Sequence, residues 1–249
     1  MNLVQSLPQF SILGLPVHLL ADYPAWLGQQ LAERSGQHVV TLNAEMAMQS
    51  EQNPTLAGII RQATLVIPDG AGIVLYLKLY GRQVKKCAGI ALAESLIRRA
   101  AQLPSASVFF YGGKPGVAEK AGDRWQSQLP TLQVAGVADG YATEETELLQ
   151  RLQTLQPGVI FVGLGVPRQE LWIAANRHHC PNSIWIGVGG SFDIWAGTKD
   201  RAPAIFADNH LEWAYRLYQE PWRWKRMMAL PQFALKALGY RLTGRGAIP

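Results

Sequence analysis

The chain has 249 residues, of which 48% are hydrophobic and 16% charged, so it is long enough to bury one substantial core. Its two cysteines, Cys87 and Cys180, lie far apart and outside any CxxC pair, which argues against a disulfide framework or a thiolate zinc site. The net charge of +5 belongs to the tail: residues 1–196 carry 14 basic and 14 acidic residues, whereas residues 209–249 carry seven basic and two acidic ones.

The first twenty residues match a signal peptide poorly. No Lys or Arg precedes their apolar residues, and Pro8 and Pro16 interrupt them. No later run reaches the roughly 18 uninterrupted apolar residues that a membrane-spanning helix needs. The sequence therefore predicts a soluble protein that stays in the cytoplasm.

Runs of β-branched and aromatic residues then alternate with helix-like stretches, as in an α/β domain with a parallel sheet. The expected strands are Val39–Leu42, Thr64–Ile67, Ser107–Tyr111, a strand near Val134, and the apolar runs "VIFVG" and "SIWIG". Helices are expected from about Pro115 and, opened by Thr143, over the stretch that holds Glu145 and Glu147. Parallel strands end at one edge of a sheet, where open α/β folds bind ligands. We expect Asp69, Gln169 and Asp193 to gather there.

The stretch "VIFVGLGVPRQE", residues 159–170, resembles a dinucleotide-binding turn at its start only. A G-x-G-x-x-G fingerprint would follow Gly163 and Gly165 with a third glycine, but Arg168 stands in its place. The turn can still bring backbone close to an anion, with Gln169 and Glu170 just beyond it. A purely structural strand-to-helix turn explains the spacing equally well.

Three short polar motifs follow expected strands, and each has two interpretations. Asp69 in "IPDGAG" suits a general base at a sheet edge, although a turn-forming aspartate is the commoner explanation. Asp193 in "GGSFDIW" suits either a nucleotide hydroxyl or a helix cap. Thr41, Asn43 and Glu45 in "TLNAEM" alternate as a sugar-binding face would, and a helix N-cap is as good an explanation.

Metal chemistry finds little support in the sequence. It has no D-x-D, no H-E-x-x-H and no convergent spacing of His and Cys. Charge that develops on a phosphate would then be stabilised by cationic side chains or backbone amides, and we expect no metal or cofactor.

The tail from residue 209 supplies such cations. It is predicted as two or three short amphipathic helices punctuated by Pro221 and Pro231, with tryptophans and methionines between the arginines. No nucleic-acid recognition motif accompanies the charge. Tryptophan and arginine on amphipathic helices favour an anionic membrane surface; a basic, solvated face over a tryptophan-rich core is the plainer interpretation. We divide the chain into an α/β domain, residues 1–208, and a basic helical appendage, residues 209–249.

Taken together and in order, the motifs resemble the WecG/TagA/CpsF family of bacterial glycosyltransferases. The matching segments are "TLNAE" (41–45), "IPDGAGIV" (67–74), "YGGKPGVAEKA" (111–121), "GY" (140–141), "VGLGVPRQELWI" (162–173), "GVGGSFDIWAGTKDRAP" (187–203) and "LEWAYRLYQEPWRWKRM" (211–227). Each motif alone is weak, but seven in the family's order are highly specific.

The resemblance implies a Rossmann-like α/β fold with a C-terminal appendage that docks at the membrane and completes the site. It implies an inverting, metal-independent enzyme that moves a sugar from a UDP-sugar to a polyprenyl-diphosphate-linked sugar in cell-surface polysaccharide synthesis. In the best-known members the donor is UDP-N-acetylmannosamine and the acceptor undecaprenyl-diphosphate N-acetylglucosamine. The implied place is the cytoplasmic face of the plasma membrane, with no nucleic-acid partner; whether the chain forms a homo-oligomer is left open.

The resemblance also assigns site residues. Asp69 stands where the family has its proposed catalytic base, with Thr41 and Asn43 at sugar-contacting positions. Arg216, Arg223 and Arg226 match the appendage arginines that bring positive charge to the diphosphate. The expected UDP-sugar-binding residues are Gly112, Gly113, Tyr141, Gly163, Gly165, Gln169, Glu170, Asp193 and Arg201.

One segment departs from the family pattern. Where the family usually shows R-V-x-G-x-D, this chain reads "KCAGIA", with Lys86 for the arginine and Ala91 for the acidic residue. The departure leaves two alternatives to a mannosaminyltransferase: a different donor sugar, or a non-catalytic nucleotide-sugar or anion-binding module. A nucleotide-dependent oxidoreductase is disfavoured by the missing third glycine.

Overall fold

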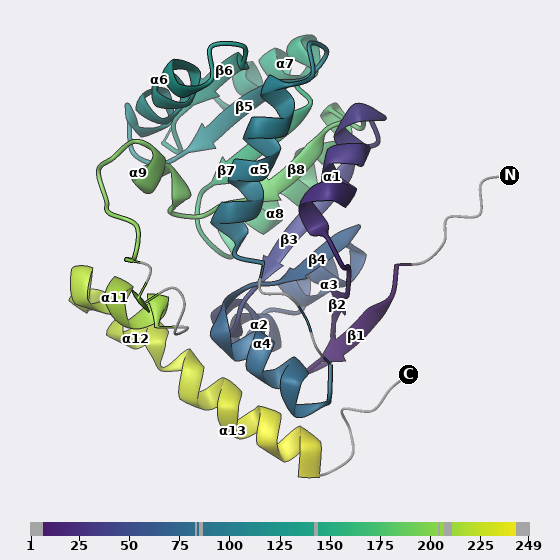
Figure 1. Cartoon of the computed structure of the whole chain (residues 1–249), viewed down its shortest axis with the longest axis vertical. Helices are drawn as coiled ribbons and strands as arrows, with labels where there is room; N and C mark the ends of the chain where they lie inside the picture. Colours follow the sequence, from purple (N-terminus) through teal and green to yellow (C-terminus); the bar gives the residue numbers. More distant parts are fainter. Residues whose placement is uncertain are drawn as a thin grey trace, which may run out of the picture. The chain divides into compact units, whose positions relative to one another are not determined.

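The computed structural model describes residues 7–82, 84, 87–141, 144–203, 205–206 and 211–242 (Figure 1). In these residues six strands form a parallel sheet in the order β4-β3-β8-β7-β5-β6. Their bounds are β3 Gln37–Leu42, β4 Leu65–Pro68, β5 Ser107–Gly112, β6 Gln133–Ala138, β7 Val159–Gly163 and β8 Ile184–Gly187. The expected α/β class with a parallel sheet flanked by helices is confirmed.

The strands form because short runs of apolar residues can be buried on both faces, which is typical of parallel sheets covered by helices. Every residue of β3, β4 and β8 is buried. β7 pairs with β5 on one side and with β8 on the other, both in parallel register, so the central strands end at one edge.

Helices connect the strands. The bounds are α1 Tyr23–Ala32, α2 Ala44–Gln52, α3 Pro54–Gln62, α4 Gly70–Leu79, α5 Gly89–Ala101, α6 Val117–Gln128, α7 Glu145–Leu155, α8 Arg168–Asn176, η1 Arg177–His179 and α9 Ser191–Trp195. Helix α7 carries Glu145 and Glu147 in its first turn, as expected; Thr143, the residue expected to open it, lies outside the described residues.

An antiparallel hairpin precedes the sheet and is not among the expected elements. Its strands are β1 Gln9–Ile12 and β2 Leu15–His18. The two residues between them, Leu13 and Gly14, both have positive φ, at 51° and 80°. Such a two-residue turn matches the twist of a hairpin.

The chain groups into two compact units, each built from segments distant in sequence. The first unit is Met1–Asp22, Leu42–Ala88 and Ala202–Pro249, and the second is Tyr23–Thr41 and Gly89–Arg201. The first unit holds the hairpin, α2 to α4 and the tail helices. The second holds α1, α5 to α9 and strands β5 to β8. The boundary expected between residues 208 and 209 lies outside the described residues.

The tail is helical but less interrupted than its prolines suggest. Its elements are α11 Glu212–Gln219, η2 Pro221–Arg223, α12 Trp224–Met227 and α13 Ala229–Leu242. Pro231 lies in the first turn of α13, where a missing N–H breaks no hydrogen bond within the helix, so the helix continues. Buried Phe233 and Ala237 fix α13 to the first unit, and the Phe233 ring lies 5.9 Å from that of Tyr76 on α4.

Candidate functional site

In the second unit, the turns that follow β5 and β7 touch each other. The N–H of Gly113 donates to the carbonyl of Gly163 at 3.0 Å. Gly112 has φ +136°, and a β-carbon there would overlap the Gly163 backbone. Only glycine at position 112 allows this approach, so the expected glycines Gly112, Gly113 and Gly163 meet at the end of the sheet.

Gln169 links the turn after β7 to the turn after β8. Its side-chain oxygen accepts the N–H groups of Gly165 at 3.2 Å and Gly189 at 3.1 Å. The side chain belongs to the first turn of α8 and is buried. Gln169 therefore holds the two glycine turns in place through hydrogen bonds with their backbone.

Glu170 continues this network into the core. It is 0% exposed, it accepts a hydrogen bond from Gln169 Nε2 at 3.1 Å, and its second oxygen lies 3.3 Å from Nε2 of His38. No pattern in the sequence singles out His38, a lone histidine in a largely apolar strand. The geometry supports a role for Gln169 and Glu170 in holding the turns, since both side chains are buried beneath them.

The loop after β6 joins the same edge through Arg168. Its guanidinium donates to the carbonyl of Gly140 at 2.9 Å. The next residue, Tyr141, is 65% exposed, and its N–H donates to the carboxylate of Asp139 at 2.8 Å. The arginine that replaces a third glycine thus ties the β7 turn to the loop that presents Tyr141.

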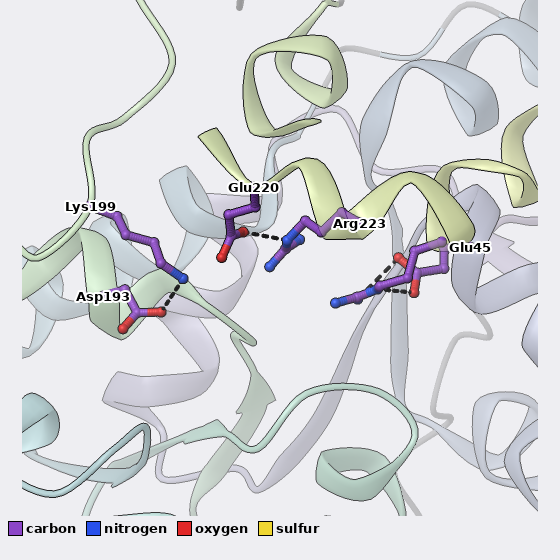
Figure 2. Close-up of polar contacts among 6 residues, drawn as sticks. Glu45, Asp193, Lys199, Glu220 and Arg223 are labelled. Carbon is purple, nitrogen blue, oxygen red and sulfur yellow. Dashed lines mark hydrogen bonds and ion pairs between the residues drawn. The ribbon is translucent and has the colours of Figure 1, made fainter. Parts of the chain in front are cut away.

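The two remaining charged residues expected at the UDP site, Asp193 and Arg201, are both ion-paired. Asp193 lies in the first turn of α9, and its carboxylate pairs with Lys199 at 2.8 Å (Figure 2). The N-cap position of α9 is held by Gly190, so Asp193 is not the cap residue of this helix. Arg201 pairs with Glu94 on α5 at 3.1 Å.

In the first unit, the turns that precede α2 and α4 lie side by side. Asn43 caps α2, its side-chain oxygen accepting the Met46 N–H at 2.9 Å. A β-carbon on Gly70 would lie 3.9 Å from that of Asn43, and the Asp69 N–H donates to the carbonyl of Leu42 at 2.9 Å. Thr41, the other expected sugar-binding residue, is buried in β3 and belongs to the second unit.

Asp69 is half-buried at the N-cap position of α4, yet its carboxylate makes no capping bond there. Its charge acts on Cys87, a buried thiol of the same unit. Burial, with the negative charges of Asp69 and Asp22, raises the pKa of Cys87 to about 12. Cys87 belongs to the segment that departs from the family pattern; Lys86 lies outside the described residues, and Ala91 is exposed on α5.

The three tail arginines expected at the site lie in this unit. Arg226 pairs with Glu45 through Nε at 2.6 Å and Nη2 at 3.1 Å, and Arg223 pairs with Glu220 (Figure 2). Burial lowers the pKa of Arg223, the positive charges of Arg226 and Arg216 lower it further, and Glu220 opposes them. The three guanidinium groups are thus near enough for their charges to interact.

Two kinds of feature are absent from the part of the chain that the structure describes. No group of three or more His, Cys, Asp or Glu side chains there is arranged to hold a metal ion. Within the same part of the chain, every helix is too short or too polar to cross a bilayer.

Comparison with known proteins identifies the family. The model of the glycosyl transferase WecG/TagA/CpsF family matches residues 10–247. The chain is 36% identical over 209 residues to the N-acetylglucosaminyldiphosphoundecaprenol N-acetyl-beta-D-mannosaminyltransferase of Bacillus spizizenii, covering 84% of this chain and 81% of the relative. It is 33% identical over 207 residues to the Bacillus subtilis protein of the same name, covering 83% and 80%. The chain therefore belongs to the WecG/TagA/CpsF family and is a glycosyltransferase.

Proposed function

We propose that this glycosyltransferase moves N-acetylmannosamine from its UDP derivative to N-acetylglucosamine linked to undecaprenyl diphosphate, in cell-surface polysaccharide synthesis. The names of the two relatives support this acceptor and this sugar, since both match more than four-fifths of this chain. The resemblance of the motif series supports UDP as the carrier.

Asp69 is the general base in this proposal. The observation that carries it is the place of this half-buried carboxylate, at the end of β4 and beside the Asn43 turn. The acceptor hydroxyl oxygen attacks the anomeric carbon and gives its proton to Asp69. The bond from that carbon to the diphosphate oxygen breaks, UDP leaves, and the configuration inverts. General-base help of this kind contributes about 10² to 10⁴ in rate.

Arg216, Arg223 and Arg226 stabilise the negative charge that grows on the departing UDP. Their support is that the charges of Arg216 and Arg226 both lower the pKa of Arg223, so both arginines lie close to Arg223. Guanidinium groups bind phosphate oxygens strongly, and they provide the neutralisation that a divalent ion provides in other transferases. The proposal therefore includes activity without a metal.

The glycine turns of the second unit bind the UDP. Gly112, Gly113, Gly163 and Gly165 carry no side chain, so an anionic group can approach the backbone closely. Gln169 and Glu170 support these turns from below, and Tyr141, Asp193 and Arg201 are candidates for direct contact with the nucleotide.

Peripheral attachment to the inner face of the plasma membrane completes the proposal. The tail exposes several large apolar side chains, which the surfaces of soluble proteins rarely gather in one segment. They are Trp222, Trp224, Met228, Leu235, Leu238 and Leu242. Lys225 and Arg241 are exposed on the same helices and suit anionic headgroups.

A UDP-release assay tests the proposed reaction. The full chain is incubated with several UDP-sugars, with and without undecaprenyl-diphosphate N-acetylglucosamine, in the presence of EDTA. We expect release that requires the lipid acceptor, is greatest with UDP-N-acetylmannosamine and persists in EDTA. Acceptor-dependent release with another UDP-sugar would refute the sugar assignment, and loss of release in EDTA would refute metal independence. No release with any pair would favour the binding module.

A further inference from the structure

The tail is tied to the start of α2 by a two-point ion pair. Arg226 on α12 donates from Nε to one oxygen of Glu45 at 2.6 Å and from Nη2 to the other at 3.1 Å (Figure 2). The Glu45 side chain is only 17% exposed, whereas that of Arg226 is 46% exposed. A bidentate pair of this kind fixes the plane of the guanidinium as well as its position.

Glu45 is itself held in place. It lies in the first turn of α2, where the positive end of the helix dipole favours a carboxylate. Gln49, one helical turn later, donates at 3.1 Å to Glu45 Oε1, the oxygen that also accepts from Arg226 Nε. The carboxylate is therefore a fixed acceptor.

This acceptor lies next to the turn that carries the proposed base. Glu45 follows the α2 cap, Asn43, by two residues, and Asn43 borders the turn formed by Asp69 and Gly70. Glu45 thereby holds the guanidinium of Arg226 at the end of α2 that adjoins this turn. All of these residues belong to the first unit.

Arg226 can bind a second partner while it is paired with Glu45. A guanidinium has more N–H donors than the two that Glu45 uses, so Arg226 keeps donors for a second, anionic partner. Its charge and that of Arg216 both act on Arg223. An arginine oriented in this way is suited to receive phosphate oxygens without a costly search for the right rotamer.

We propose that Glu45 is a positioning residue, which orients Arg226 for the diphosphate of the donor. The inference rests on the proposed function, because it assigns Glu45 a role in the same transfer. Glu45 touches neither the sugar nor the nucleotide in this account; it acts through Arg226.

A second ion pair between the tail and α2 provides a matched control. Lys236 on α13 pairs with Glu51, near the other end of α2. If Glu45 merely fastened the tail to the body of the unit, loss of Glu51 would have a similar effect. The proposal instead requires the two pairs to differ in their effect on transfer.

The test compares Glu45→Gln, Glu45→Ala and Glu51→Ala with Arg226→Ala and the double variant Glu45→Ala/Arg226→Ala, using the full chain. We expect Glu45→Ala to lower kcat/KM by about tenfold to a hundredfold, because misplacing a catalytic group by about 1 Å costs that much. Glu45→Gln, which keeps one acceptor oxygen, should lie between Glu45→Ala and the wild type. Glu51→Ala should match the wild type.

The double variant decides whether Glu45 acts through Arg226. We expect it to be no slower than Arg226→Ala alone, since a positioning residue has nothing left to position. Effects of the two single changes that simply multiply, or equal losses in Glu45→Ala and Glu51→Ala, would overturn the proposal.

Hydrogen exchange gives a readout that does not depend on turnover. We expect faster exchange of the backbone amides of residues 223–228 in Glu45→Ala than in Glu51→Ala. If the wild type transfers no sugar, the proposed function fails while this comparison still decides whether Glu45 holds Arg226. Unchanged exchange in Glu45→Ala would overturn the positioning role.

Discussion

Glu170 faces His38 at 3.3 Å in the interior of the second unit, with side chains that are 0% and 2% exposed. The same carboxylate accepts a hydrogen bond from Gln169 Nε2. The side-chain oxygen of Gln169 in turn accepts hydrogen bonds from the backbone N–H groups of two glycine turns. A chain of buried hydrogen bonds thus runs from β3 to the edge of the sheet. Networks of this kind stabilise a structure only when every member keeps its partner.

Removal of the Glu170 side chain should therefore destabilise the protein strongly. Glu170→Ala removes the acceptor of two buried hydrogen bonds, from His38 Nε2 and Gln169 Nε2. We expect a loss of about 2–6 kcal/mol in the free energy of unfolding, since each such loss costs about 1–3 kcal/mol. Urea denaturation measures it. Glu147→Ala, at an exposed position of α7, is the control and should change stability by no more than about 0.5 kcal/mol. A loss below about 1 kcal/mol for Glu170→Ala would show that the network is not structural.

His18 gives the fold a pH dependence. Its Nδ1 accepts the Val66 N–H at 2.8 Å, and burial lowers its pKa below the ordinary value. The folded state then binds protons less readily than the unfolded state, so stability from His18 is present above the unfolded pKa, about 6.5, and is lost as the pH falls below it.

Thermal unfolding at pH 7.5 and 5.5 measures this effect. We expect the wild type to lose more stability between the two pH values than His18→Gln, which has no imidazole to titrate. The comparison of slopes removes the contribution of other groups and any general destabilisation by the substitution. Parallel slopes would contradict the assignment.

The outer face of α13 should govern membrane binding. Leu235, Leu238 and Leu242 share one face of the helix and are 72%, 52% and 79% exposed, while Phe233 and Ala237 hold the helix to its unit. Changing the three leucines to serine should spare the fold. It should lower partition onto anionic vesicles by at least about tenfold, because each buried leucine is worth about 1.5–3 kcal/mol.

Vesicle co-sedimentation provides the measurement. Leu155→Ser, a change at an exposed leucine at the end of α7, should leave partition unchanged. Wild-type partition by the triple variant would remove the membrane role from this face.

Much of the sheet could be predicted because its strands are short apolar runs, and four of them, β4, β5, β7 and β8, end in proline or glycine. The expected Val39–Leu42, Thr64–Ile67 and Ser107–Tyr111 match β3, β4 and β5 to within three residues. The β1–β2 hairpin could not be predicted in this way, because its turn places Leu13 at φ 51° and lacks the usual Asn-Gly or Asp-Gly pair. Pro231 was expected to punctuate the tail helices, but it lies in the first turn of α13, where a proline does not interrupt the helix.

The site was predictable only as a set of segments. The sequence indicates that glycine turns and polar residues follow the strands, and the structure joins Gly112, Gly113 and Gly163. The sequence does not indicate which of these side chains point inward. In the sequence Gln169 and Glu170 look like exposed polar residues beyond a turn, but both are buried. Their partner His38, and the arginine partners Glu94 and Glu220, belong to no motif of the predicted site.

The role of Asp69 is the central claim and is tested most directly by Asp69→Asn. Sugar transfer and UDP binding are measured on the same preparations, with Asp123→Asn, an exposed change on α6, as the control. We expect turnover to fall by about 10² to 10⁴ while UDP affinity and thermal stability stay close to those of the wild type. Near wild-type turnover by Asp69→Asn would contradict the account.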